Sequence, residues 1–351
     1  MNDSKKENNR FFPLGKLKHE FLAKMLKDFV SDLRIKDERI IIGSKIGEDA
    51  AVIDMGDTYL IAKSDPITFA TSEIGYYAVN VNVNDVVCMG AKPKWFQSTI
   101  LLPEKNTTEA LISTIFKNIH DTCQSMNITV VGGHTEITPN LDRPIVIGSL
   151  LGEVEKDNLV NTKETKPGDA LILTKGVFIE GTSIIGREKE EELKQKELGH
   201  EFIETCKNYL YEPGISVFKE AILANKNFKI NGFHDVTEGG LFTAVAEMAI
   251  ASDTGILIDR EKINILPEPL ILSKLYNLNP FNTISSGSLL IAIDEHNENP
   301  SKLIDILNKN NISAENIGKF VSKKEGLRIK EKNGVIKPLS YSETDEITKI
   351  F

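Results

Sequence analysis

Two stretches of the chain repeat apolar residues at helical spacing. Residues 14–33 place apolar side chains on one face and lysines and acids on the other, which is typical of an amphipathic helix packed on a core. Residues 107–126 show the same period, and Thr107 or Thr108 stands where an N-cap belongs. The pattern predicts a helix in each stretch.

Short β-branched runs alternate with Gly, Asp and Pro elsewhere in the first half of the chain. Such runs predict strands joined by tight loops in residues 41–68 and another strand in 94–103. Residues 128–138 and 143–154 are interpreted as further strands around a Gly-Gly turn. Residues 79–85, VNVNVND, fit two structures, because strict alternation indicates a half-buried strand while the valines also fit one helical face.

A polar, Pro- and Gly-punctuated segment near residues 157–168 divides the chain. It predicts one domain over 1–160 and a second over 161–351. The second repeats the mixed pattern, with a strand at DALILTK, a charged helical stretch ending in REKEEELKQKE, a helix that begins at Gly240 and a strand at SSGSLLIAI. The fold class is therefore α/β (α+β), and the charged stretch is interpreted as a solvated helix face or a mobile insertion.

Composition narrows the class of protein. The chain has 351 residues, 42 basic and 51 acidic, so its net charge of −9 disfavours a nucleic-acid or anionic-membrane surface. No apolar run approaches the roughly 20 residues that span a bilayer, and no secretory leader is visible. The three cysteines are far apart in the sequence, so reduced thiols and a cytoplasmic location are expected.

Common nucleotide motifs are missing from the sequence. It contains neither a P-loop nor a Rossmann glycine fingerprint. Acids, Asn and Gly instead recur in predicted loops, where each alone is typical of a turn or a backbone cap. Together they suit Mg²⁺, a hard cation that takes oxygen ligands and shares them with phosphates. The residues concerned are Asp49, Lys63, Asp65, Asn84, Asp85, Gly132, Gly133, His134, Glu136, His234, Asp235, Gly239 and Gly240.

Charge suggests a further role for two of these segments. The DVTEGGL segment leads into a helix, and the backbone N–H groups at Gly239 and Gly240 would favour an anion. Lys63 is interpreted as a cation that neutralises a transferring phosphoryl group, or as an ordinary surface lysine.

Seven ordered motifs resemble the aminoimidazole ribonucleotide (AIR) synthase superfamily, in particular its branch of HypE-like, AIR synthase-related proteins. The motifs are GEDAAVID, AKSDPITFAT, AVNVNVNDVVCMGAKPKWF, VVGGHTEIT, DRPIVIGSLLGEV, FHDVTEGGL and SSGSLLIAI. The resemblance implies a PurM-like fold of two α/β domains, whose N-terminal domains pair into a β-barrel in a homodimer. ATP and Mg²⁺ would lie in a cleft bounded by both domains, and VNVNVND would be a helix.

The resemblance also implies roles for single residues. Asp49, Asp65 and Asp85 match the acidic positions that hold Mg²⁺–ATP, and Lys63 matches the lysine of the HypE-like branch. The other matched positions are expected to contact the cofactor: Asn84 in the Asn-Asp pair, Gly132 and Gly133 in the glycine turn, Asp235 at the start of the second-domain loop, and Gly239 and Gly240 at the helix entrance.

Two departures from the family pattern are visible. His134 stands where thiamine-monophosphate kinases have an aspartate, and Glu136 follows two residues later. The HypE tail ends in a cysteine, whereas this sequence ends DEITKIF, so self-modification by that route is not expected.

The sequence is therefore compatible with three functions. The first is an ATP- and Mg²⁺-dependent enzyme that phosphorylates an amide or carbonyl oxygen, with Lys63 stabilising charge and His134 or His234 moving protons. Either histidine is equally well explained as a hydrogen-bonded structural residue. The second is a small-molecule kinase, and the third is an ATP-binding partner or scaffold without turnover. The sequence does not identify the acceptor substrate.

Overall fold

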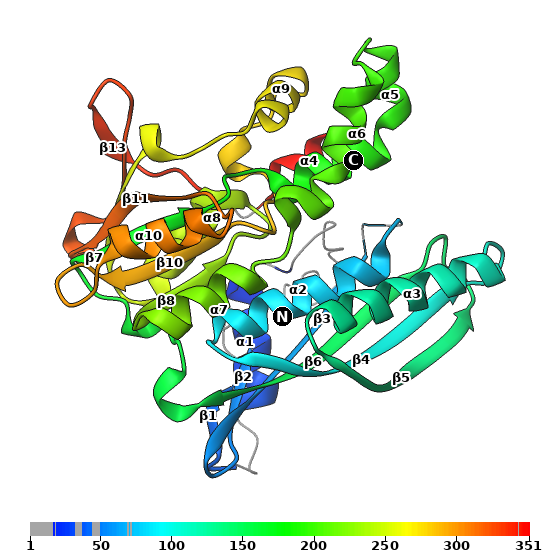
Figure 1. The fold of residues 1–351 in the computed structure, drawn as a ribbon, viewed down its shortest axis with the longest axis horizontal. Coiled ribbons are helices and arrows are strands. Elements are labelled where there is room, and N and C mark those ends of the chain that lie inside the picture. The colour runs from blue at the N-terminus through cyan, green and yellow to red at the C-terminus, as the bar shows by residue number, and fades with distance from the viewer. Residues whose placement is uncertain are drawn as a thin grey trace, which may run out of the picture.

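A computed structural model describes residues 17, 19–31, 37–43, 50–68, 70, 72–342 and 344–351. The predicted ligand Asp49 lies outside the described residues. Two sheets with associated helices make up the chain (Figure 1), which confirms the α/β class. The domain boundary after residue 160 stays a prediction.

The first sheet has six strands in the order β1-β2-β3-β6-β4-β5. All neighbours are antiparallel except the parallel pair β4–β5. Its strands are β1 Ile40–Ile42, β2 Ala51–Asp54, β3 Thr58–Ile67, β4 Lys92–Pro103, β5 Thr129–Thr138 and β6 Ile145–Glu155. The helices α2 (Ile74–Cys88) and α3 (Glu109–Ser125) lie side by side on one face (Figure 1). In one chain the sheet is open at β1 and β5, so the predicted barrel between two copies stays a prediction.

The second sheet has seven strands in the order β13-β12-β9-β11-β7-β10-β8. They are β7 Asp169–Thr174, β8 Ile230–Asp235, β9 Gly255–Asp259, β10 Leu289–Asp294, β11 Ala314–Val321, β12 Leu327–Lys330 and β13 Ile336–Pro338. The longer helices after β6 are α4 Ile179–Glu188, α5 Glu190–Gln195, α6 His200–Asn208, α7 Phe218–Asn227, α8 Gly240–Ala251, α9 Pro267–Leu275 and α10 Pro300–Lys309. The strands predicted at DALILTK and SSGSLLIAI and the helix predicted from Gly240 are confirmed.

Shorter helical segments complete the chain. Two are π-helical, at Lys27–Ser31 and Leu210–Gly214. The others are 3₁₀ turns at Lys156–Asn158, Thr162–Glu164, Arg260–Lys262, Pro280–Asn282, Lys323–Glu325 and Glu346–Lys349.

The VNVNVND stretch lies within α2, so it is a helix as the family resemblance implies. The helix is buried on nearly every side, which explains why its sequence shows no polar face. Each of its buried asparagines hydrogen-bonds to the backbone, although Asn80 Oδ1 has no hydrogen-bond partner among the described residues. Asn80 Nδ2 donates to Tyr76 O at 2.9 Å, and Asn82 Nδ2 donates to Ala78 O at 2.8 Å.

The apolar core runs without interruption from one sheet to the other. Val79, Val83 and Val86 of α2 belong to the same buried cluster as Ile172 of β7 and Phe233 of β8. Helix α2 therefore packs against both halves of the molecule and fixes any group on it relative to both.

Both predicted amphipathic helices are present in the structure, but they differ in how deeply they are buried. Helix α3 is confirmed, and the Thr108 hydroxyl accepts from Leu111 N at 3.2 Å as its N-cap. The first helix, α1 (His19–Leu26), continues into the π-helix at Lys27–Ser31, so the helical part of that prediction holds. Its apolar residues Phe21, Leu22, Met25 and Leu26 are half-buried and Phe29 is 71% exposed. The helix is therefore amphipathic as predicted, but none of residues 21–30 is fully buried in a core.

The predicted Gly-Gly turn is also wrong. Strand β5 runs straight through Gly132 and Gly133, with a register shift against β4 at Phe96/Gln97. A Cβ atom on Gly133 would lie 2.1 Å from Ser98 O, so glycine permits close approach of the two strands. The glycines therefore lie within a continuous strand, next to a β-bulge, and do not reverse the chain.

Two further predictions concern the whole chain. All three cysteines, Cys88, Cys123 and Cys206, are free and buried, as expected for reduced thiols. Within the described ranges, no helix has both the length and the apolar character needed to cross a membrane.

Candidate functional site

Lys63, Asp65 and Asp85 meet beside the first sheet. Lys63 and Asp65 are two residues apart on β3, so their side chains lie on the same face, and α2 brings Asp85 to that face. Lys63 Nζ lies 3.2 Å from Asp65 Oδ2 and 3.1 Å from Asp85 Oδ2. The exposed fractions of the three side chains are 19%, 35% and 9% respectively. Three of the predicted site residues are thus brought together in a partly open place.

Asn82 holds this arrangement in register. Its Oδ1 accepts from Asp65 N at 3.0 Å, and its Nδ2 lies 3.4 Å from Asp65 O. The side chain is fully buried, so it ties β3 to α2 beside the acidic pair. The sequence places Asn82 in the same polar segment as Asn84 and Asp85, but its pattern alone did not predict this positioning role.

The donor set suits a hard cation. Two carboxylates converge on one positive charge, and Mg²⁺ is often held by one or two carboxylates together with substrate phosphates. No group of three or more His, Cys, Asp or Glu that suits a metal occurs in the part of the chain that the structure describes. Asp65 and Asp85 therefore fit Mg²⁺ shared with a phosphate ligand and do not form a closed protein cage.

The glycines of β5 share a row of the sheet with Asp65. The strand register pairs Asp65 with Gly148, Gly148 with Ser98, and Ser98 with Gly133. Three strand spacings of about 4.8 Å separate Gly133 from Asp65 by roughly 14 Å. The two residues are thus aligned across the sheet without contact.

The two candidate histidines each pair with a carboxylate. His134 lies on the edge strand β5, where its Nε2 is 3.1 Å from Glu136 Oε2 and its side chain is 64% exposed. His234 Nε2 is 2.9 Å from Glu247 Oε2, which connects β8 to α8. Neither pair includes Lys63, Asp65 or Asp85. Their proton-transfer roles stay predictions.

The glycine loop before α8 lies at the second sheet. Asp235 ends β8 and is 2% exposed, and Gly239 and Gly240 have φ angles of 82° and 66°. A Cβ atom on Gly240 would lie 2.7 Å from Phe281 O, so only glycine fits there without a shift. Gly239 N donates to Asp345 Oδ2 at 2.6 Å. The N–H predicted to hold an anion therefore binds a carboxylate from the C-terminal segment of the same chain.

Asn84 links α2 to the second half of the molecule. Its Nδ2 donates to Ile215 O at 2.9 Å, and its Oδ1 accepts from Val217 N at 2.9 Å. The side chain is fully buried. Asn84 and Asp85 thus face different parts of the chain, one bound to the segment before α7 and the other to Lys63. The nucleotide contact expected of Asn84 stays a prediction.

Glu180 and Asp345 are buried acids that lie near enough to affect each other's charge, and the sequence pattern did not predict them. Glu180 is 7% exposed, and its Oε2 has no hydrogen-bond partner. Burial raises the pKa of Glu180 to about 7, against the effect of hydrogen bonds from Ser286. Burial likewise raises the pKa of Asp345 to about 6. The available signal for Glu180 was an acid within the apolar run Val-Phe-Ile-Glu-Gly.

The Glu180→Gln variant should remove a pH dependence of stability. The folded-state pKa of about 7 exceeds the ordinary value of 4.5, so the folded protein holds the extra proton between these pH values. The free energy of unfolding therefore falls as pH rises through this window, by about 3 kcal/mol for a shift of this size.

Urea unfolding of both proteins from pH 5 to pH 8 measures this effect. The variant should give a flatter profile and exceed the native protein in stability at pH 8. Parallel profiles for the two proteins would contradict the burial argument.

Two sheets joined through α2, with a partly open carboxylate–lysine cluster beside the first, define a two-domain α/β protein. Two family models describe the sequence: "AIR synthase related protein, N-terminal domain" matches residues 47–154, and the corresponding C-terminal domain matches residues 166–330. The chain belongs to the AIR synthase-related family.

Curated relatives support this assignment. The chain is 29% identical over 254 residues to a "Putative hydrogenase expression/formation protein" of Methanocaldococcus jannaschii, covering 69% of this chain and 72% of the relative. It is also 29% identical over 301 residues to the phosphoribosylformylglycinamidine cyclo-ligase of Acetivibrio thermocellus, covering 81% and 83% of the two chains.

Solved structures agree with the fold. AaThiL complexed with AMPPCP and TMP superposes with a TM-score of 0.69 at 19% identity, over 93% of this chain and 94% of that one. The hydrogenase maturation protein HypE in complex with ATP superposes with a TM-score of 0.65 at 18% identity, over 92% and 95%. At these identities the likeness establishes the PurM-like fold alone.

Proposed function

We propose that the protein is an ATP- and Mg²⁺-dependent enzyme that phosphorylates an amide or carbonyl oxygen, so that the oxygen can leave in a dehydration or ring closure. The observation that carries the proposal is the junction of Lys63 with Asp65 and Asp85. Family membership supports it, since one relative is a cyclo-ligase and a structure of similar fold is a complex with ATP.

Each residue of the site has a part in this proposal. Asp65 and Asp85 would hold Mg²⁺, with Asp49 as the third acid, and the metal would supply positive charge to the β- and γ-phosphates. Lys63 lies within 3.2 Å of both described carboxylates, so its ammonium group can stabilise negative charge on the transferred phosphoryl group. Asn82 positions Asp65 through its backbone.

The fate of the γ-phosphate distinguishes the three functions. ATP labelled at that phosphate should release free phosphate when an amide-bearing acceptor is present. Label that remains on a small molecule would identify a kinase instead. ATP that binds and stays intact with every acceptor would identify a nucleotide-binding protein without turnover.

We also propose that two copies pair through β5. This edge strand is exposed along most of its length, including Val131 at 48% and Ile137 at 58%. Exposed apolar edges are commonly covered by a partner strand. The three free thiols suit a reducing compartment, so the proposed location is the cytoplasm.

Light scattering should report a particle of twice the 39.0 kDa chain mass. The Val131→Lys variant places a charge on the edge strand and should give monomers. Phe116→Lys is the matched control, because Phe116 is 50% exposed and belongs to α3, not to the edge strand. A dimer that persists in Val131→Lys would contradict pairing through β5.

A further inference from the structure

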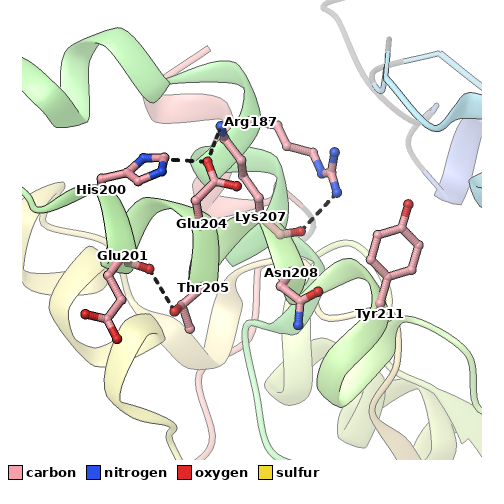
Figure 2. Close-up of a pocket in the computed structure, with 8 residues that line it drawn as sticks. All are labelled: Arg187, His200, Glu201, Glu204, Thr205, Lys207, Asn208 and Tyr211. Carbon is pink, nitrogen blue, oxygen red and sulfur yellow. Dashed lines mark hydrogen bonds and ion pairs between the residues drawn. The ribbon is translucent and has the colours of Figure 1, made fainter.

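A groove of about 740 Å³ lies along α4, α6 and the π-helical turn that follows α6 (Figure 2). The groove is shallow and largely open to solvent. Arg187 and Tyr211 lie toward one side of it in Figure 2, and Glu201 and His200 toward the other. The groove does not include any residue proposed above for ATP or Mg²⁺.

Arg187 and Lys207, the two permanent cations of the groove, are bound differently. Lys207 Nζ pairs with Glu190 at 2.7 Å and with Glu204 at 2.8 Å. Arg187 binds only neutral oxygens, through Nε to Ser183 Oγ at 3.3 Å and through Nη2 to Lys207 O at 3.0 Å. No carboxylate among residues 37–43, 50–68, 72–342 or 344–351 forms an ion pair with it. Its charge is oriented but not neutralised.

Tyr211 provides an aromatic surface beside this charge. Its ring is 6.0 Å from the Arg187 guanidinium carbon, and the residue is 46% exposed. The ring meets Tyr76 of α2 edge-on at 5.0 Å between centroids, which fixes its orientation. Burial and a hydrogen bond to Glu73 raise the pKa of Tyr211 to about 12, and the Glu73 carboxylate also accepts from Asn118 Nδ2.

We propose that this groove binds a small molecule with one carboxylate or phosphate on a planar, unsaturated body. The anionic group would bind Arg187, whose planar fork suits both anions, and the body would lie along Tyr211. Glu201 lines the other side and disfavours a second negative charge there. The ligand therefore carries its anion at one end.

This groove is separate from the proposed ATP site, so the inference does not depend on the proposed function. Helix α2 contacts both places, because Tyr76 packs on Tyr211 and Asp85 faces Lys63. Nine residues separate Tyr76 from Asp85, which is about 13.5 Å and two and a half turns of helix, so the two side chains leave opposite faces of α2.

Calorimetric titration with phenyl phosphate, benzoate and inorganic phosphate tests the groove, with benzylamine as a cation of similar size. The native protein should bind phenyl phosphate or benzoate at least 10-fold more tightly than inorganic phosphate or benzylamine. Arg187→Gln should weaken this binding at least 10-fold and Tyr211→Leu should weaken it as well. Arg143→Gln, a surface arginine beside Asp142, should leave it unchanged.

The affinity for ATP with Mg²⁺ is measured on the same variants. Arg187→Gln should leave it unchanged, which also shows that this variant is folded. Aryl anions that fail to bind the native protein, or that bind Arg187→Gln equally well, would overturn the groove proposal. Loss of ATP binding with retained phenyl phosphate binding would contradict the proposed function and leave the groove proposal standing.

Discussion

The Asp85→Asn variant is expected to lose ATP turnover by at least roughly 100-fold, the usual cost of removing one electrostatic group from a reacting centre. The substitution keeps the shape of a side chain that is 9% exposed and removes the charge that faces Lys63. Under the proposed function, a Mg²⁺ ligand and the carboxylate beside Lys63 would be lost together. Steady-state phosphate release and the affinity for ATP with Mg²⁺ measure the effect.

The matched control is Asp54→Asn. Asp54 also pairs with a lysine in the first sheet, at 2.7 Å from Lys156 Nζ, but near the start of β3 and away from α2. This variant should keep native turnover. Equal turnover in Asp85→Asn and Asp54→Asn would remove Asp85 from the proposed site.

The second large effect is expected for Asn84→Ala. Truncation leaves Ile215 O and Val217 N without their side-chain partner at a fully buried position. Each buried polar group left unpaired costs about 1–3 kcal/mol, so the free energy of unfolding should fall by about 2–4 kcal/mol. Urea unfolding followed by circular dichroism measures this loss.

Asn227→Ala provides the control for Asn84. Asn227 also donates to a backbone carbonyl, Leu223 O at 2.7 Å, but it is exposed at the end of α7. Its replacement should change stability by less than about 0.5 kcal/mol. A similarly small change in Asn84→Ala would show that the contact between α2 and the segment before α7 contributes little.

Local patterns predicted the elements that have one buried face. Helix α3 shows a regular apolar stripe and a Thr108 cap, and both are present in the structure. The strands of the first sheet, and β7 and β10 of the second, follow their β-branched runs in the same way. Helix α2 could not be distinguished from a strand by its pattern, because tertiary contacts bury its valines and its asparagines alike.

Features that depend on distant contacts were missed. The bulge lies between Val130 and Gly132, and Gly133 beside it closely approaches Ser98 on the neighbouring strand, whereas a Gly-Gly pair by itself suggests a turn. Asn82, Glu180 and Asp345 acquire their roles only when segments far apart in sequence meet. Lys63, Asp65 and Asp85 were found because family motifs marked them, and the structure shows that two elements bring them into contact.

The binding of ATP to the native protein, with and without Mg²⁺, tests the central claim most directly. If Asp65 and Asp85 share a cation with the nucleotide phosphates, isothermal titration should show one ATP per chain with Mg²⁺ present. The affinity should fall at least 10-fold when the metal is chelated. Absence of ATP binding, or an affinity that does not depend on Mg²⁺, would contradict the account.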